Sequence, residues 1–165
     1  MKRFLVLVGM LLCVLMINAQ YVEKKHQFGI ELGVGGNGMT AVDFGLRWQT
    51  NFHPNVSWDV LTVKAVGCPE ELGSTITPQV MTGIHLTSPE FAGMSAYVIA
   101  RCGYGYWVEG ESGDVCFEVG AGINLTKHVY IGYVFNHQSG DGDSYDYKYV
   151  DYTANYHAAR IGFLF

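Results

Sequence analysis

The stretch VCFEVGAGINL, residues 115–125, decides the fold. Every second residue from Val115 to Leu125 is apolar, and the residues between them are polar or small. Successive side chains of a strand point to opposite faces, so this period of two predicts a β-strand with one apolar face. Residues 129–136, VYIGYVFN, repeat the pattern after a short turn. The two stretches together predict an antiparallel hairpin.

Six further segments show the same alternation. They are 27–35, 42–49, 56–60, 76–86, 94–105 and 159–165. After residue 19, no segment shows a sustained helical period with a starting cap and a glycine stop. A chain of 165 residues has room for one domain. The sequence therefore predicts an all-β fold, an eight-stranded antiparallel up-and-down β-barrel.

The first nineteen residues have the composition of a secretory signal peptide. Lys2 and Arg3 precede an apolar run from Phe4 to Ile17, and Ala19 is a small residue at a suitable cleavage point. The run is shorter than the roughly 20 residues that a membrane-spanning helix needs, and no stop-transfer charges follow it. We predict a signal peptide over 1–19 and a barrel domain over 20–165.

Charge and cysteine content exclude several classes of function. Removing the signal peptide removes two basic residues and leaves all 15 acidic residues, so nucleic acid is excluded as a partner. Cys68, Cys102 and Cys116 remain, with spacings that match no zinc or redox motif. We expect unpaired, half-buried thiols, no metal and no cofactor.

The polar face of the predicted strands carries an unusual set of charges: Glu31, Asp43, Arg47, Asp59, Arg101, Glu118 and Arg160. A membrane barrel places apolar side chains outside and polar ones inside, whereas a soluble lipocalin-type barrel does the opposite. Inside a narrow barrel these acids and arginines could pair with one another. The sequence predicts a transmembrane barrel, with a secreted soluble barrel that binds an apolar ligand as an alternative.

Aromatic residues cluster near both ends of the strands, as in the interfacial girdles of membrane barrels. One set contains Trp48, Phe52, Trp58, Phe91 and Phe163, and the other contains Tyr104, Tyr106, Phe135, Tyr152 and Tyr156. Lys64 is an exception to the expected polarity, because it falls on the lipid-facing parity of its strand. Its ammonium group would reach the rim, unless a β-bulge shifts the strand.

The chain ends in Arg160-Ile161-Gly162-Phe163-Leu164-Phe165. With the signal peptide and eight strands, this ending resembles the small outer-membrane β-barrels of the OmpA and OmpX type over the whole mature chain. The resemblance implies the outer membrane of a Gram-negative bacterium, contact with outer-membrane lipid and lipopolysaccharide, and recognition of Phe163 and Phe165 by the barrel-assembly machinery. An eight-stranded lumen is filled by side chains, so the interior charges are expected to form a structural core.

Connection lengths predict the orientation. The connections 51–55, 87–93 and 125–128 are short, 36–40 is an exception, and 67–75, 108–114 and 137–155 are polar and mostly longer. Outer-membrane barrels have short periplasmic turns and longer outer loops. We therefore expect the acidic, tyrosine-rich loop between His137 and Asn155 to face outward as a possible surface for a ligand. Residues 141–146 resemble a calcium loop but lack its later glutamate.

The strongest catalytic candidates are His137 and Ser139, with Asp151 further along the chain. A histidine and a serine two apart resemble the outer-membrane lipid A deacylases, in which an acid orients the histidine for ester hydrolysis. That family usually has asparagine after the serine, where this chain has Gly140. A histidine and serine at this spacing are more commonly polar residues beside a loop, without a catalytic role. The leading hypothesis is a non-enzymatic barrel that serves envelope integrity or surface contact, and the alternative is a lipid-modifying enzyme.

Overall fold

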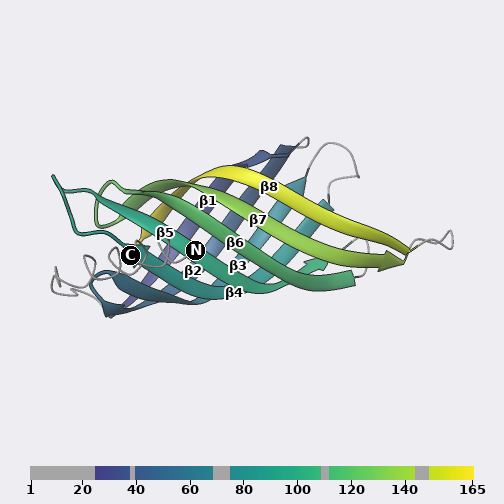
Figure 1. Ribbon diagram of the computed structural model, residues 1–165, viewed down its shortest axis with the longest axis horizontal. Coiled ribbons are helices and arrows are strands. Elements are labelled where there is room, and N and C mark those ends of the chain that lie inside the picture. Colours follow the sequence, from purple (N-terminus) through teal and green to yellow (C-terminus); the bar gives the residue numbers. More distant parts are fainter. Residues whose placement is uncertain (1–24, 38–39, 69–74, 109–111, 144–148) are drawn as a thin grey trace, which may run out of the picture.

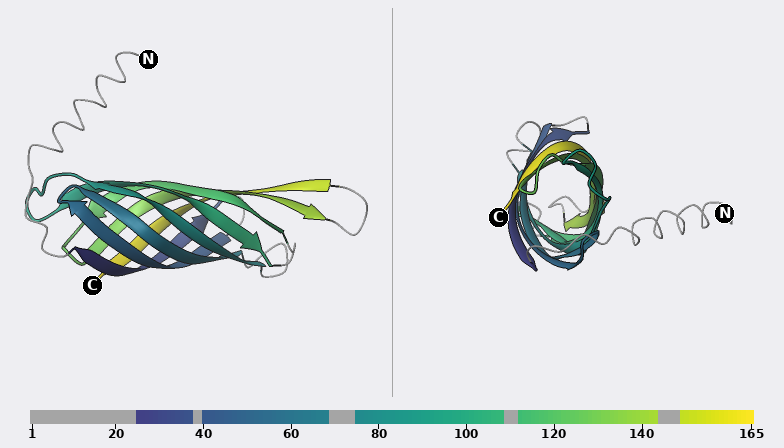
Figure 2. Two further views of the ribbon diagram at one scale, coloured as in Figure 1. Left: turned by 90° about the horizontal axis from the view of Figure 1, so that it is seen from below. Right: turned by 90° about the vertical axis from the view of Figure 1, so that its left-hand side faces the viewer.

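The computed structural model describes residues 25–37, 40–68, 75–108, 112–143 and 149–165, so the predicted signal peptide lies outside the described residues. Eight antiparallel strands form one closed barrel, as Figures 1 and 2 show. They are β1 (His26–Gly36), β2 (Thr40–His53), β3 (Val56–Cys68), β4 (Thr75–Thr87), β5 (Ser95–Trp107), β6 (Ser112–Asn124), β7 (Val129–Asp143) and β8 (Tyr149–Leu164). Each strand pairs with the next along the chain, which confirms the predicted up-and-down barrel.

The carboxy terminus closes the barrel against the first strand. The backbone N–H of Phe165 donates to the carbonyl of Phe28 at 2.8 Å, and β8 pairs with β1 from Leu164 opposite Gly29 onward. This pairing removes the two free edges that an open eight-stranded sheet would expose.

Side chains alternate between the two faces of the wall. In β2, residues 41–49 alternate between buried and exposed, with the apolar members Phe44 and Leu46 on the outside. The predicted polar face points into the lumen, and the predicted apolar face forms the outer surface. None of the described residues forms a helix long and apolar enough to span a membrane.

A β-bulge in β3 corrects the prediction for Lys64. The pairing of β3 with β4 shifts between Asp59 and Thr62, and the extra residue reverses the alternation beyond it. Val63 is exposed on the outer surface, whereas Lys64 is only 1% exposed and lies in the lumen. Lys64 therefore does not face lipid, and the alternative that a β-bulge shifts the strand is confirmed.

The predicted loop between His137 and Asn155 is largely a hairpin. Strands β7 and β8 remain paired up to Asp143 opposite Tyr149, and this hairpin extends beyond the other strands, at the right of Figure 1. At the same end, the other connections are 37–39, 69–74 and 108–111; at the opposite end they are 54–55, 88–94 and 125–128. The expected contrast in loop length is wrong, because a strand ladder continues through polar sequence wherever backbone hydrogen bonds can form.

Glycines on the inner face make room for large side chains. A Cβ atom at Gly162 would lie 2.0 Å from the ring of Tyr130, and one at Gly132 would lie 2.1 Å from the hydroxyl of Tyr97. Both tyrosines are buried and meet edge to face, with 5.5 Å between ring centroids. The glycines of the period-two pattern thus allow a tightly packed lumen.

Candidate functional site: the charged lumen and the outer shoulder

The lumen contains the seven charged residues that the sequence placed on the polar face, together with Lys64. All eight are buried. Four are acidic and four are basic: Glu31, Asp43, Asp59 and Glu118 face Arg47, Lys64, Arg101 and Arg160. Lys64 therefore makes the charge of this buried set neutral, which the three arginines alone would not do.

Arg101 is the centre of the network. Its Nε donates to Asp59 at 2.7 Å, Nη2 donates to Glu31 at 2.8 Å, and Nη1 donates to Glu31 at 2.8 Å and to Glu118 at 2.9 Å. Strand β5, which carries Arg101, is four strands away from β1, which carries Glu31. This guanidinium therefore joins opposite walls of the barrel.

Glu118 gathers three of the cations. It accepts hydrogen bonds from Arg160 at 2.7 and 2.8 Å, from Arg101, and from the Lys64 ammonium group. Lys64 also donates to the Tyr156 hydroxyl at 2.9 Å, and that hydroxyl donates to Asp43 at 3.2 Å. The prediction that Tyr156 belongs to the outer aromatic girdle is wrong, because its side chain is 6% exposed and lies in the lumen.

Polar contacts continue along the lumen on both sides of Arg101. Tyr130 donates to Glu31 at 2.6 Å, and its ring lies 5.0 Å from the guanidinium carbon of Arg47. Toward the hairpin end, Gln79 bonds to Gln138 at 2.7 Å from across the barrel. A soluble barrel that holds an apolar ligand needs an apolar interior. This alternative is wrong for the present chain, because paired charges fill the interior.

The outer surface has the opposite character. Exposed apolar side chains come from every strand, among them Phe28, Phe44, Leu46, Val63, Ile76, Ile84, Val98, Val119, Tyr133 and Ile161. Trp48, Phe52, Trp58, Phe91 and Phe163 are exposed toward the short-turn end, and Tyr104 and Tyr106 toward the hairpin end. A continuous apolar surface of this extent is covered in a native protein, and the apolar band with aromatic borders is that of a membrane barrel.

Comparison with solved structures supports the fold. A barrel described under "De novo design of transmembrane beta-barrels" is similar with a TM-score of 0.52 and 14% identity, over 90% of this chain and 100% of that one. The chain has the fold of the small transmembrane β-barrels. The N-terminal β-barrel domain of Pseudomonas aeruginosa OprF is similar with a TM-score of 0.51 and 13% identity, over 84% of this chain and 97% of that domain. No protein-family model and no curated protein sequence matches the chain.

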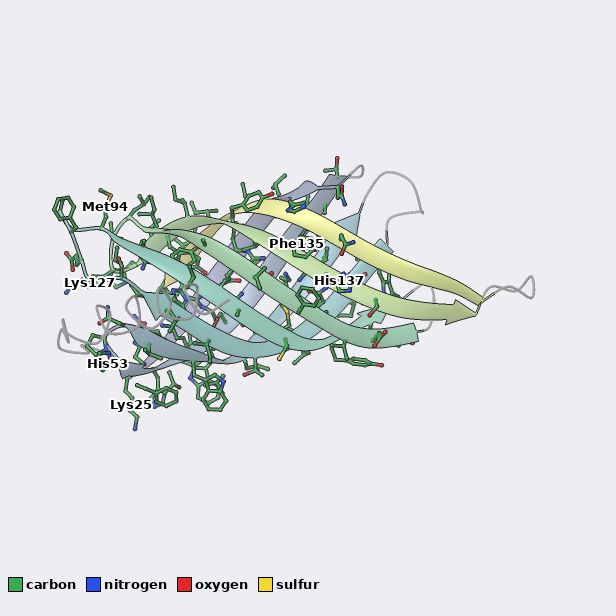
Figure 3. All side chains as sticks on the ribbon, in the orientation of Figure 1. Lys25, His53, Met94, Lys127, Phe135 and His137 are labelled. Atoms are coloured by element: carbon green, nitrogen blue, oxygen red, sulfur yellow. The ribbon has the colours of Figure 1, made fainter. Side chains whose placement is uncertain are left out.

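The candidate catalytic residues of this transmembrane barrel lie in β7 and β8, toward the hairpin end: His137 and Ser139 in β7 and Asp151 in β8. His137 projects from β7 beyond Phe135, in the hairpin half of the barrel (Figure 3). Its Nδ1 lies 2.5 Å from the Asn155 Oδ1, and its ring lies 4.7 Å from the Phe117 ring. Ser139 has the same outward parity, two pairs further along the ladder, where it pairs with Thr153. Histidine and serine thus share a face, as the sequence predicted.

The structure does not bring Asp151 to this histidine. Asn155 pairs with His137, whereas Asp151 pairs with Asp141. Four residues along a strand separate Asn155 from Asp151, about 13 Å at the usual rise. The orienting partner of His137 is therefore a neutral amide. Sequence reasoning missed Asn155, and only the register of the long hairpin could have identified it.

The cysteines lie on both faces of the barrel wall. Cys116 is fully buried in the lumen, Cys102 is exposed on the outer surface, and both thiols are free. The prediction of unpaired thiols is confirmed for these two, but neither is half-buried. The side chain of Cys68 lies outside the described residues.

Proposed function

We propose that this chain is a non-enzymatic outer-membrane protein of a Gram-negative bacterium, exported by a cleaved signal peptide. The inverted polarity of the barrel carries the proposal: an apolar exterior surrounds a lumen of balanced, mutually bonded charges. The barrel is a rigid membrane anchor. Its role is to stabilise the envelope or to hold its projecting end in contact with the surroundings.

The barrel does not serve as a diffusion pore. Side chains fill the lumen of eight-stranded barrels, and here the bonds of Arg101 and Glu118 connect strands across the lumen. Opening a path would require breaking several buried ion pairs, and each broken pair leaves an uncompensated charge. A structural role for the charged core therefore fits better than a transport role.

The hairpin end is proposed to face the cell exterior. The sequence at this end, in the connections and in the outer part of the hairpin of β7 and β8, is rich in acidic residues, with Glu70, Glu71, Glu109, Glu111, Asp141, Asp143, Asp146 and Asp151 against Lys148. Tyr145, Tyr147, Tyr149 and Tyr152 add side chains suited to protein contacts. This chemistry suits a basic surface partner. Membrane lipid and lipopolysaccharide surround the wall, and the barrel-assembly machinery recognises the terminal strand with Phe163 and Phe165.

Fractionation and electrophoresis test the proposal. The protein should be recovered from the outer-membrane fraction and should migrate faster in unheated than in heated samples, because the closed barrel resists detergent until it is heated. Reconstituted in planar bilayers, it should show no stepwise conductance. Recovery of folded protein from the soluble periplasm would overturn the proposal, and regular conductance steps would overturn the sealed lumen.

A further inference from the structure

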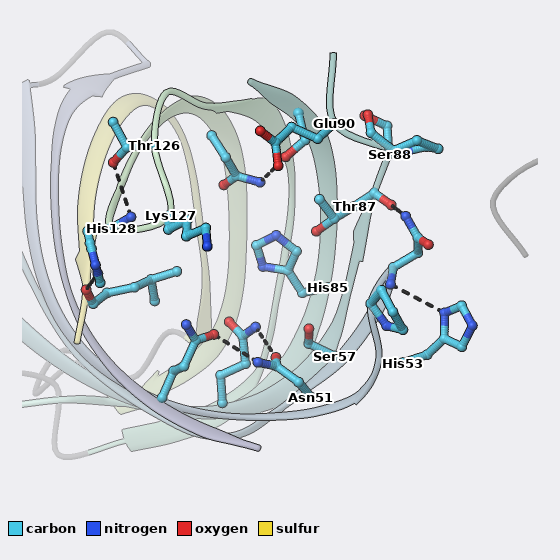
Figure 4. A pocket seen from close by; sticks show the side chains of 18 of the residues that line it. Asn51, His53, Ser57, His85, Thr87, Ser88, Glu90, Thr126, Lys127 and His128 are labelled. Atoms are coloured by element: carbon cyan, nitrogen blue, oxygen red, sulfur yellow. Dashed lines mark hydrogen bonds between the residues drawn. The ribbon is translucent and has the colours of Figure 1, made fainter. Parts of the chain in front are cut away.

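Two hollows of the barrel lie outside the charged core. A polar cavity of about 480 Å³ opens at the short-turn end of the lumen (Figure 4). A second hollow, of about 610 Å³, lies on the outer surface across β6, β7, β8 and β1. We call it the outer groove. In a transmembrane barrel this groove faces lipid, and its outward-facing side chains are apolar or aromatic, among them Val34, Ala121, Ile123, Tyr133, Ala159 and Ile161.

Two alanines create the outer groove. Tyr133 of β7 pairs with Ala121 of β6 and with Ala159 of β8, and Ala159 in turn pairs with Val34 of β1. The Tyr133 side chain is 57% exposed, whereas the methyl groups on either side of it are short and leave the wall low. An acyl chain that lies along the tyrosine ring therefore gains contacts at its side as well as beneath it, and such contacts add up.

The outer groove leads to two histidines toward the hairpin end. The ring of Tyr133 stacks on the ring of His157 at 5.6 Å between centroids, and His157 lies 5.0 Å from the ring of Phe135. In the ladder His157 pairs with Phe135 and His137 pairs with Asn155, so the two histidines are diagonal neighbours on adjacent strands. Side chains at diagonal positions of one face start about 7 Å apart. Two half-buried imidazoles thus flank one short stretch of the outer wall.

The position of the histidines along their strands matches a membrane interface. His157 is the ninth residue counted back from Phe165, and His137 is the ninth residue counted from Val129, where β7 begins. A membrane-spanning strand has about 9–11 residues. His157 also pairs with Gly36, the last residue of β1. The imidazoles therefore lie where the hydrocarbon of a bilayer ends and the head groups begin.

Both imidazole rings can present a nitrogen to an anion. Nδ1 of His157 is buried and has no hydrogen-bond partner in the described part of the chain. A proton on that atom would be unsatisfied, so the neutral ring carries its proton on Nε2 and donates from there. Nδ1 of His137 contacts Asn155, so Nε2 is the nitrogen that remains for a ligand. Hydrogen bonds to a charged phosphate are stronger than those between neutral groups.

We propose that the outer groove and the two histidines bind one molecule of lipid A, with an acyl chain along Tyr133 and a phosphate group between His137 and His157. An amphiphile with an anionic head group matches an apolar groove that ends in imidazoles at the interface. The outer leaflet as the source of lipid A rests on the proposed function, in which the hairpin end faces the cell exterior. Binding in detergent depends only on the folded barrel, so a failure of binding is distinguishable from a failure of the membrane location.

Native mass spectrometry of the full mature chain folded in detergent micelles tests the proposal, with diphosphorylated lipid A and phosphatidylglycerol as probes. We expect one lipid A per barrel, retained in preference to phosphatidylglycerol, because a phosphate monoester carries more charge than a diester. His157→Leu and His137→Leu each remove a donor and should weaken lipid A binding about tenfold, the usual worth of one hydrogen bond to a charged group. His26→Leu, at an exposed histidine of the short-turn end, is the matched control and should leave binding unchanged.

A second pair of variants tests the acyl half of the site. Ala159→Leu fills the outer groove while the wall stays apolar, and it should weaken lipid A binding at least tenfold. Ala65→Leu is the matched control, because Ala65 is an exposed alanine of β3, four strands away from β7. It should bind lipid A as the unaltered protein does. Slower migration after heating shows that each variant forms the closed barrel.

Several results would overturn the proposal. Equal retention of lipid A and phosphatidylglycerol would make the outer groove a general lipid contact. Unchanged binding in both His157→Leu and His137→Leu would remove the phosphate site. Equal weakening by Ala65→Leu and Ala159→Leu would assign the effect to the stability of the barrel. A dimer that retains no lipid A and dissociates on Ala159→Leu would show that a second copy of the chain occupies the groove.

Discussion

Replacing Lys64 by methionine distinguishes a lysine in the lumen from a lysine that faces lipid. The free energy of unfolding should fall in the first case and rise in the second. In the lumen, Lys64→Met removes a cation from Glu118 and Tyr156. Removing one partner of a buried pair costs 3–5 kcal/mol. Glu118 still accepts hydrogen bonds from Arg101 and Arg160 in this variant. We therefore expect a loss at the lower end of this range, about 3 kcal/mol in the free energy of unfolding. A lysine facing lipid would instead destabilise the barrel by roughly 2–4 kcal/mol, and replacing it would raise stability.

Urea titration of the barrel folded in phospholipid vesicles measures this difference through tryptophan fluorescence. With a slope of roughly 2 kcal/mol per molar urea, the midpoint should fall by about 1.5 M. Val63→Met, on the outer surface next to Lys64, is the control and should change the midpoint little. Adding Glu118→Gln to Lys64→Met restores neutrality and should recover part of the loss. An unchanged or raised midpoint for Lys64→Met would refute both the inward placement and the neutral core.

Three further predictions concern packing, exposure and chemistry. Gly162→Ala places a Cβ 2.0 Å from Tyr130 and should lower the free energy of unfolding by about 1–3 kcal/mol in the same urea titration. Gly67→Ala is the control, because its nearest contact is at 3.9 Å, and it should leave the free energy of unfolding unchanged. Equal effects of the two substitutions would contradict the packed lumen. A lipid-soluble maleimide should label Cys102 in the folded barrel and Cys116 only after unfolding, as peptide mass spectrometry would show, and early labelling of Cys116 would argue against its lumenal position. Lipid A from cells that express the unaltered chain or Ser139→Ala should have the same acylation by mass spectrometry, because the partner of the His137 ring is the neutral amide of Asn155 and not a carboxylate. Acylation that changes with Ser139 would revive the esterase hypothesis.

The strand pattern made most of the fold predictable. Alternation in segments such as 115–125 and 129–136 is a local property, so it identifies the strands and their two faces without knowledge of their neighbours. The charges on the polar face were predictable for the same reason. The pattern also indicated the membrane, because arginines and acids on one face need each other when the opposite face is apolar.

Register was harder to predict than pattern. The bulge between Asp59 and Thr62 inserts a single residue, which the pairing of β3 with β2 and with β4 reveals. It moved Lys64 from the outer face to the lumen. Likewise, the contact of His137 with Asn155 depends on how far the last hairpin stays paired. Polar sequence gives no local sign of where such pairing ends.

The sequence by itself determined that eight strands alternate, that their apolar face is continuous and that the chain ends in a strand. Only the tertiary structure decided which residues meet inside the barrel. Arg101 bonds to Glu31 over a separation of 70 residues, and Tyr156 bonds to Asp43 over 113. The physical reason is closure: side-chain direction follows from the local backbone, whereas partners across a lumen depend on the stagger of all eight strands. The polar cavity at the short-turn end, which Gln49 and Asn55 help to line, is likewise a product of that closure.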